Sequence, residues 1–323
     1  MPDYVISVRN VSRGKLGSEP GTTRFLKIPG DHAQPKPAHG ISRATWVEEV
    51  MEWSRSGTDP ATGRDCGDIL VFVHGYNNDP PVVLKRHRLL KMNLAAAGFE
   101  GAVVSFDWPS NNIALNYLED RSDARVTSIK LVDDCIRLFT LTQLRGCAFN
   151  VHLLAHSTGA YVIREGFDDA DDRRNIAATN WTASQVVLIG ADVSAKSLGV
   201  EDSKSSSLYR HAVRLTNYQN PYDSVLKLSN IKRVGVAPRA GRVGLPGKLP
   251  HKAVNVNCGP YFQSLPPDSD ATGAWEHSWF FNDPLFARDL THTLQGDIDR
   301  NYIPTRKRAK DGALLLDRKS EIA

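Results

Sequence analysis

The stretch that decides the fold is FNVHLLAHSTGAYVI, residues 149–163. Residues 150–154 are a short run of apolar and β-capable residues, which is typical of a buried parallel strand. The small residues 155–159 predict a turn, and residues 160–167 can continue as a helix. A serine on such a sharp strand-to-helix turn is held in a strained backbone conformation that exposes its hydroxyl over the sheet edge, so the residues two positions away must be small.

Ser157, at the centre of this turn, has two interpretations. The motif AHSTG departs from the nucleophile pattern G-x-S-x-G only at its first position, where Ala155 still permits close packing of helix against strand. Ser157 is therefore either a nucleophile or a residue that caps the following helix. The choice depends on whether partner residues follow in the right order.

The rest of the chain predicts an α/β protein. Strand and helix alternate regularly, which indicates a doubly wound, mostly parallel sheet with helices on both faces. The predicted core strands are residues 68–73, 102–106, 150–154, 185–189, 212–217 and 253–257, and the main helices are residues 81–97, 112–144, 160–167, 224–229 and 282–295.

The predicted catalytic core spans residues 68–300. Before it, residues 1–67 form an extension with a hairpin (4–8 and 23–28) and a helix (42–56) capped by Ser42, which either joins the sheet edge or acts as a cap. Residues 235–250 are predicted as a long surface loop, and this loop and the extension are the candidates for a lid. After the core, residues 301–323 are predicted as a basic, disordered tail.

Composition excludes several classes of function. The 40 Lys and Arg against 36 Asp and Glu leave a net charge of +4, too small and dispersed to indicate nucleic acid binding. The N-terminus has no signal-peptide pattern, and no apolar run approaches the roughly 20 residues of a membrane span. The four cysteines show neither a C-x-x-C pair nor metal-like spacing with histidine. We expect a cytoplasmic protein with free thiols and no cofactor or metal; the sequence sets no oligomeric state.

Polar residues that suit acyl transfer follow Ser157 in order. A serine nucleophile needs a histidine to take its proton, a carboxylate to orient that histidine, and two N–H groups to meet the oxyanion. Asp192 and Asp223 each follow a predicted strand, and His277 lies in the loop after the last one. This order of serine, acid and histidine is that of the α/β-hydrolase fold.

With these residues, the chain resembles the α/β-hydrolase superfamily, and within it a bacterial group of esterase- and lipase-like proteins with a strand ending in H-G-Y-N. The resemblance implies Ser157 as nucleophile, Asp223 as acid and His277 as base, with the backbone N–H groups of Tyr76 and Thr158 as the oxyanion hole. The matching stretches are VFVHGYNN (71–78), VVSFDWPS (103–110), LLAHSTGAYV (153–162), VVLIGADVS (186–194), YQNPYDSVLKLS (218–229) and EHSWFF (276–281).

Several alternatives stay open. Asp192 is the alternative acid, while Asp223 could instead cap the helix that follows it, and His277 could be a core histidine packed on aromatic residues. The candidates for lining a substrate pocket share a place at or beside the predicted strand ends: His74, Tyr76, Trp108 and His156. Of these, His74 is expected to brace its loop, and the Tyr76 side chain is expected to touch substrate.

The predicted activity is that of a serine hydrolase acting on small to medium carboxylic esters through a Ser157 acyl-enzyme. A thioesterase, amidase or peptidase would use the same triad. The alternative from another class is a catalytically silent α/β-hydrolase scaffold that binds a ligand, because fold alone does not determine function.

Overall fold

One sheet runs through the whole molecule. The computed structural model describes residues 1–110, 117–139, 148–179, 181–231 and 238–318. Its sheet has 12 strands, with β4 (Arg55–Thr58) beside β5 and the others in the order β11-β12-β10-β9-β8-β7-β5-β6-β1-β2-β3. The parallel centre consists of β6 (Ala102–Asp107), β5 (Asp65–Val73), β7 (Ala148–His156), β8 (Ala183–Ile189), β9 (Ala212–Gln219) and β10 (Ala253–Asn257). The predicted doubly wound α/β fold is confirmed.

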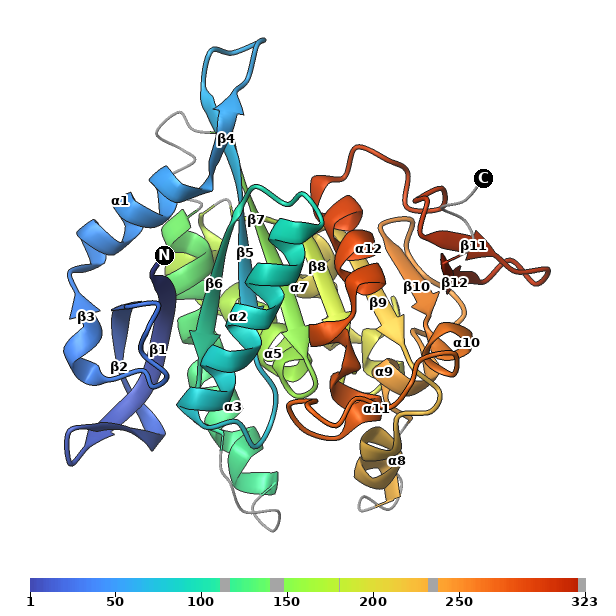
Figure 1. The fold of residues 1–323 in the computed structure, drawn as a ribbon, viewed down its shortest axis with the longest axis horizontal. Coiled ribbons are helices and arrows are strands. Elements are labelled where there is room, and N and C mark those ends of the chain that lie inside the picture. The colour runs from blue at the N-terminus through green and yellow to red at the C-terminus, as the bar shows by residue number, and fades with distance from the viewer. Residues whose placement is uncertain (111–116, 140–147, 180, 232–237, 319–323) are drawn as a thin grey trace.

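Helices cover both faces of the sheet (Figure 1). Side chains alternate along β5, so Ile69 and Val71 belong to one apolar cluster while Leu70 and Phe72 belong to the other. The first cluster contains residues of α1 (Arg43–Ser54), α3 (Tyr117–Leu131), α5 (Gly159–Asp171) and α7 (Ser203–His211). The second contains residues of α2 (Pro80–Ala96), α10 (Gly259–Phe262) and α12 (Pro284–Gln295).

The N-terminal extension lengthens the sheet. β1 (Asp3–Ser12) and β2 (Lys15–Ile28) form the predicted hairpin, closed by Arg13 and Gly14 with φ of 49° and 73°, as a tight two-residue turn requires. β1 then pairs in parallel with β6, and β3 (Gly40–Ile41) pairs with β2. Helix α1 follows, and Ser42 caps it as predicted by accepting the N–H of Thr45. The strands β1, β2 and β3 thus continue the sheet beyond β6.

The predicted disordered tail needs correction, because residues 306–308 and 314–316 form two strands; residues 319–323 of the prediction lie outside the described residues. β11 (Arg306–Arg308) pairs with β12 (Leu314–Leu316), and β12 runs parallel to β10. Arg306 is buried, and its Nη2 lies 2.6 Å from Asp289 Oδ1 on α12. The basic run predicted a solvated tail, but one of its charges is neutralised inside the protein.

Two other predicted segments also differ. Residues 238–250 of the predicted surface loop contain α9 (Ala240–Val243), which packs so closely on the chain after β8 that a Cβ at Gly241 would lie 2.0 Å from the Ala191 nitrogen. The predicted helix 112–144 is described only from Tyr117 to Phe139, as α3 and a π-helical turn (Val132–Ile136).

Cys66, Cys135 and Cys258 are free thiols, and Cys147 lies outside the described residues.

Candidate active site

Ser157 occupies a strained turn between β7 and α5. Its φ is 56°, in the left-handed region that a residue with a side chain rarely adopts. The turn is fixed through its backbone, since the Ser157 N–H donates to the Ile189 carbonyl (3.1 Å) and its own carbonyl accepts the Asp192 N–H (3.0 Å). Small neighbours are required: a Cβ at Gly159 would lie 2.3 Å from the Val73 carbonyl oxygen, and one at Gly75 would lie 2.6 Å from Ser157 Cβ.

His277 contacts Asp223 directly. The imidazole belongs to the short helix α11 (Trp275–Ser278), and its Nδ1 lies 2.6 Å from Asp223 Oδ2. The other carboxylate oxygen of Asp223 accepts the N–H of Leu226 (2.9 Å), so Asp223 also caps α8 (Ser224–Ile231). The carboxylate orients the ring with the proton on Nδ1, which leaves Nε2 able to accept one.

Gly190 separates the nucleophile turn from the histidine. A Cβ at this glycine would lie 3.1 Å from both Cε1 and Nδ1 of His277. The backbone groups that bond Ser157 belong to Ile189, directly before Gly190, and to Asp192, two residues after it. His156 makes a second link, since its ring centroid lies 4.6 Å from that of His277 and its Nε2 donates to the His277 carbonyl (2.9 Å). Ser157 is thus bonded through its backbone to the chain around Gly190, and Gly190 lies against the His277 ring that Asp223 contacts.

The alternative acid, Asp192, has other partners. Its Oδ1 lies 2.9 Å from Arg239 Nε and accepts the hydroxyl of Ser229 (2.9 Å). Arg239, which the sequence analysis placed in a surface loop, is buried at 2% exposure. Asp192 therefore belongs to an ion pair that ties α9 to the chain after β8.

Contacts from three directions hold the short helix of His277. Asn220 donates to the Glu276 carbonyl (2.9 Å) from the loop that also bears Asp223, while Arg86 of α2 donates to Ser278 Oγ (3.3 Å). His156, the last residue of β7, donates to the His277 carbonyl. Burial lowers the pKa of Arg86 to about 10 and keeps the pKa of His156 well below its ordinary value.

The loop after β5 is braced by the buried pair of His74 and Trp108. Their rings stack at 5.4 Å, the Trp108 indole N–H donates to the His74 carbonyl (2.8 Å), and the Trp108 backbone N–H donates to His74 Nε2 (3.1 Å). Because Nε2 accepts, His74 carries its proton on Nδ1 and donates it to the Gly75 carbonyl (2.8 Å). Burial lowers the pKa of His74, which favours this neutral form.

The four pocket candidates consequently differ in position. His74, Trp108 and His156 are buried and pack against other protein groups. Tyr76 is partly exposed. Sequence reasoning assigned none of these contacts to Gly190, Asn220, Arg86 or Arg239. Gly190 and Asn220 lie within the matching stretches, but the role of each of the four residues depends on a contact distant in sequence.

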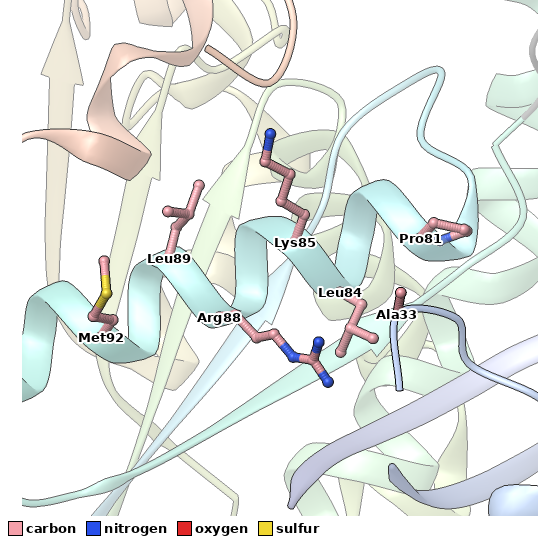
Figure 2. A pocket seen from close by; sticks show the side chains of 7 residues that line it. All are labelled: Ala33, Pro81, Leu84, Lys85, Arg88, Leu89 and Met92. Carbon is pink, nitrogen blue, oxygen red and sulfur yellow. The ribbon is translucent and has the colours of Figure 1, made fainter. Parts of the chain in front are cut away.

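A separate cavity lies on the outer side of α2 (Figure 2). It measures about 400 Å³ and is lined by apolar and basic residues: Ala33, Pro81, Leu84, Lys85, Arg88, Leu89 and Met92. Ser157, His277 and Asp223 are not among them, so the cavity is not the mouth of the candidate site.

Within the described ranges, no group of three or more His, Cys, Asp and Glu side chains is arranged to hold a metal ion. None of the helices in the described part of the chain has both the length and the apolar character needed to cross a lipid bilayer.

Comparison with known proteins places the chain in a family. It is 12% identical to lipase B of Aspergillus fumigatus, with 92% of this chain and 67% of the lipase covered at a TM-score of 0.43. It is 15% identical to phospholipase PlaB of Legionella pneumophila, solved with thio-NAD, with 59% of this chain and 37% of the phospholipase covered at a TM-score of 0.28. No curated protein matches. Because a family model matches residues 60–252, the chain belongs to the alpha/beta hydrolases of unknown function designated DUF900.

Proposed function

We propose that this hydrolase cleaves small to medium carboxylic esters through an acyl-enzyme on Ser157. The observation that carries the proposal is the 2.6 Å contact of His277 Nδ1 with Asp223 Oδ2 beside a serine at φ 56°. A buried carboxylate on one imidazole nitrogen and a strained serine nearby are what general-base activation of a hydroxyl needs. The free thiols support the cytoplasm as its compartment.

In the first half of the reaction, Ser157 Oγ attacks the ester carbonyl while His277 Nε2 takes the hydroxyl proton. Asp223 stabilises the imidazolium that forms and keeps its tautomer and orientation. The backbone N–H groups of Tyr76 and Thr158 would stabilise the oxyanion of the tetrahedral intermediate. The intermediate collapses to the acyl-enzyme as the alcohol leaves with the proton from His277.

In the second half, His277 accepts a proton from a water molecule, which attacks the acyl carbonyl. The second tetrahedral intermediate expels Ser157 Oγ, which recovers its proton from His277, and the carboxylic acid is released. No cofactor takes part in either half. A thioester, amide or peptide bond would be cleaved by the same steps, and a substrate panel that varies the leaving group distinguishes these activities.

A fluorophosphonate probe tests the proposal. We expect it to label Ser157, located by peptide mass spectrometry, and Ser157→Ala to abolish labelling and lower hydrolysis of p-nitrophenyl acetate and butyrate by about 10⁴-fold or more. Ser206→Ala, which removes an exposed serine on α7, is the matched control and should behave as the wild-type protein. A wild-type protein that neither labels nor hydrolyses any ester would instead support a silent binding scaffold.

A further inference from the structure

Arg9 of the N-terminal hairpin reaches the loop that carries Tyr76. It lies outside the matched residues 60–252, yet its side chain is buried. Its Nε donates to Asp107 Oδ1 (2.7 Å) at the end of β6, and its Nη2 donates to the Asn78 carbonyl (2.8 Å). One planar guanidinium therefore joins the hairpin, the end of β6 and the loop.

Asn78, which Arg9 contacts, is itself hydrogen-bonded to the backbone of the loop. Its side-chain Nδ2 donates to the carbonyls of Gly75 (2.8 Å) and Tyr76 (3.0 Å), and its own N–H donates to Ser110 Oγ (3.1 Å). Asn77 has φ of 55°, an unfavourable conformation for a residue with a side chain. The loop consequently depends on outside contacts to keep its shape.

The Gly75 carbonyl determines where the Tyr76 N–H points. The two groups belong to one planar trans peptide unit, so they point in opposite directions. His74 Nδ1 and Asn78 Nδ2 both donate to this carbonyl at 2.8 Å. Gly75 itself packs against Ser157. Holding the carbonyl therefore holds the direction of an N–H group next to the nucleophile.

We propose that Arg9 is a positioning residue for the oxyanion hole. Arg9 holds Asn78, and Asn78 fixes the peptide unit between Gly75 and Tyr76, which contains the Tyr76 N–H group. The inference rests on the proposed function, because the Tyr76 N–H matters only if an oxyanion forms at Ser157. The N-terminal hairpin is then part of the catalytic apparatus and not a separate appendage.

The ion pair of Arg9 and Asp107 suits this role. Burial alone would raise the pKa of Asp107, but the charge of Arg9 together with the neighbouring His74 ring outweighs it and lowers the pKa to about 2. Asp107 Oδ2 also accepts the hydroxyl of Ser7 (2.8 Å), so β1 supplies two contacts to one carboxylate. The guanidinium is thereby held in one place while its Nη2 contacts Asn78.

The test uses variants that leave no buried charge unpaired. Arg9→Met combined with Asp107→Asn removes the pair, and Arg306→Met combined with Asp289→Asn is the matched control, since that buried pair lies on the C-terminal strands and α12. Each full-length protein is assayed for kcat and KM on p-nitrophenyl butyrate, for the rate of fluorophosphonate labelling of Ser157, and for melting temperature.

We expect the Arg9 double variant to lose about 10- to 100-fold in kcat and in labelling rate with KM nearly unchanged, because a misdirected oxyanion donor weakens only the transition state. The control should lose stability without that loss of kcat. Arg9→Lys, which cannot contact Asp107 and Asn78 together, should lie between the wild type and the double variant. On an Asn78→Ala background, the Arg9 change should have little further effect on kcat.

Three results would overturn the inference. If the wild type is labelled and the Arg9 double variant is labelled at the same rate, the inference is wrong but the proposed function stands. An equal fall of kcat in the control pair shows a general effect of stability. A wild type that is not labelled at all defeats the proposed function and this inference with it.

Discussion

Asp192 and Asp223 follow successive strands of the sheet, β8 and β9, but they contact different groups. Asp223 lies 2.6 Å from the imidazole of His277, whereas Asp192 lies 2.9 Å from the guanidinium of Arg239. Both side chains are buried. The difference shows that the role of a carboxylate at a strand end depends on the side chain that it contacts. A buried charge needs a partner, and a carboxylate paired with a guanidinium is not available to orient an imidazole.

The largest effect is expected at Asp223. Asp223→Asn should lower kcat for ester hydrolysis by roughly 10³- to 10⁴-fold, because an amide no longer enforces the imidazole tautomer or stabilises the imidazolium. The measurement is steady-state kinetics on p-nitrophenyl esters, with the Asp223→Asn and Asp192→Asn variants compared with the wild type. If Asp192→Asn abolishes activity and Asp223→Asn does not, the two assignments must be exchanged.

The next effect concerns the stability of the Asp192 pair. Asp192→Asn leaves the Arg239 charge buried without its ion partner, which should cost roughly 3–5 kcal/mol in the free energy of unfolding, while kcat of the folded fraction changes little. Urea unfolding measures it. Adding Arg239→Met should restore much of the lost stability, and a double variant no more stable than the single one would contradict the ion-pair account.

A smaller effect is expected at Gly190, which lies two residues before Asp192 and against the His277 ring that Asp223 contacts. Gly190→Ala introduces a Cβ 3.1 Å from the His277 ring at a φ of 50°, so the ring must move and kcat should fall by roughly tenfold. Gly98→Ala is the matched control, because its φ is 85° but no atom lies within 4 Å of the added Cβ. Equal losses of kcat in both variants would mean that backbone strain alone is responsible.

The smallest effect extends the comparison to Asp107, at the end of β6. Its pKa falls from 3.8 to about 2 on folding, so it stabilises the protein above about pH 4, and this stabilisation is lost as the pH falls toward 2. The stability difference between the wild type and the Arg9→Met, Asp107→Asn double variant should therefore shrink on acidification. A difference that stays constant from pH 5 to 2.5 in urea titrations would show that Asp107 does not supply it.

Local sequence patterns predicted the centre of the fold well. The apolar runs that became β5, β6 and β7 are covered on both faces, and the small residues around Ser157 allow its strained turn. The basic run near Arg306 was misread because composition cannot show that Asp289 lies beside it. Residues 239–241 of the predicted surface loop are buried for the same reason, since Asp192 pairs with Arg239 from a distant part of the chain.

The sequence by itself determined the parallel sheet, the turn at Ser157 and the order of serine, acid and histidine, because these depend on short-range periodicity and on backbone conformations that few residues allow. Only the tertiary structure decided which aspartate reaches His277 and that Arg9 supports the loop of Tyr76. Those contacts join residues 54 and 69 positions apart. Their geometry arises from how strands pack side by side, and no local pattern encodes that distance.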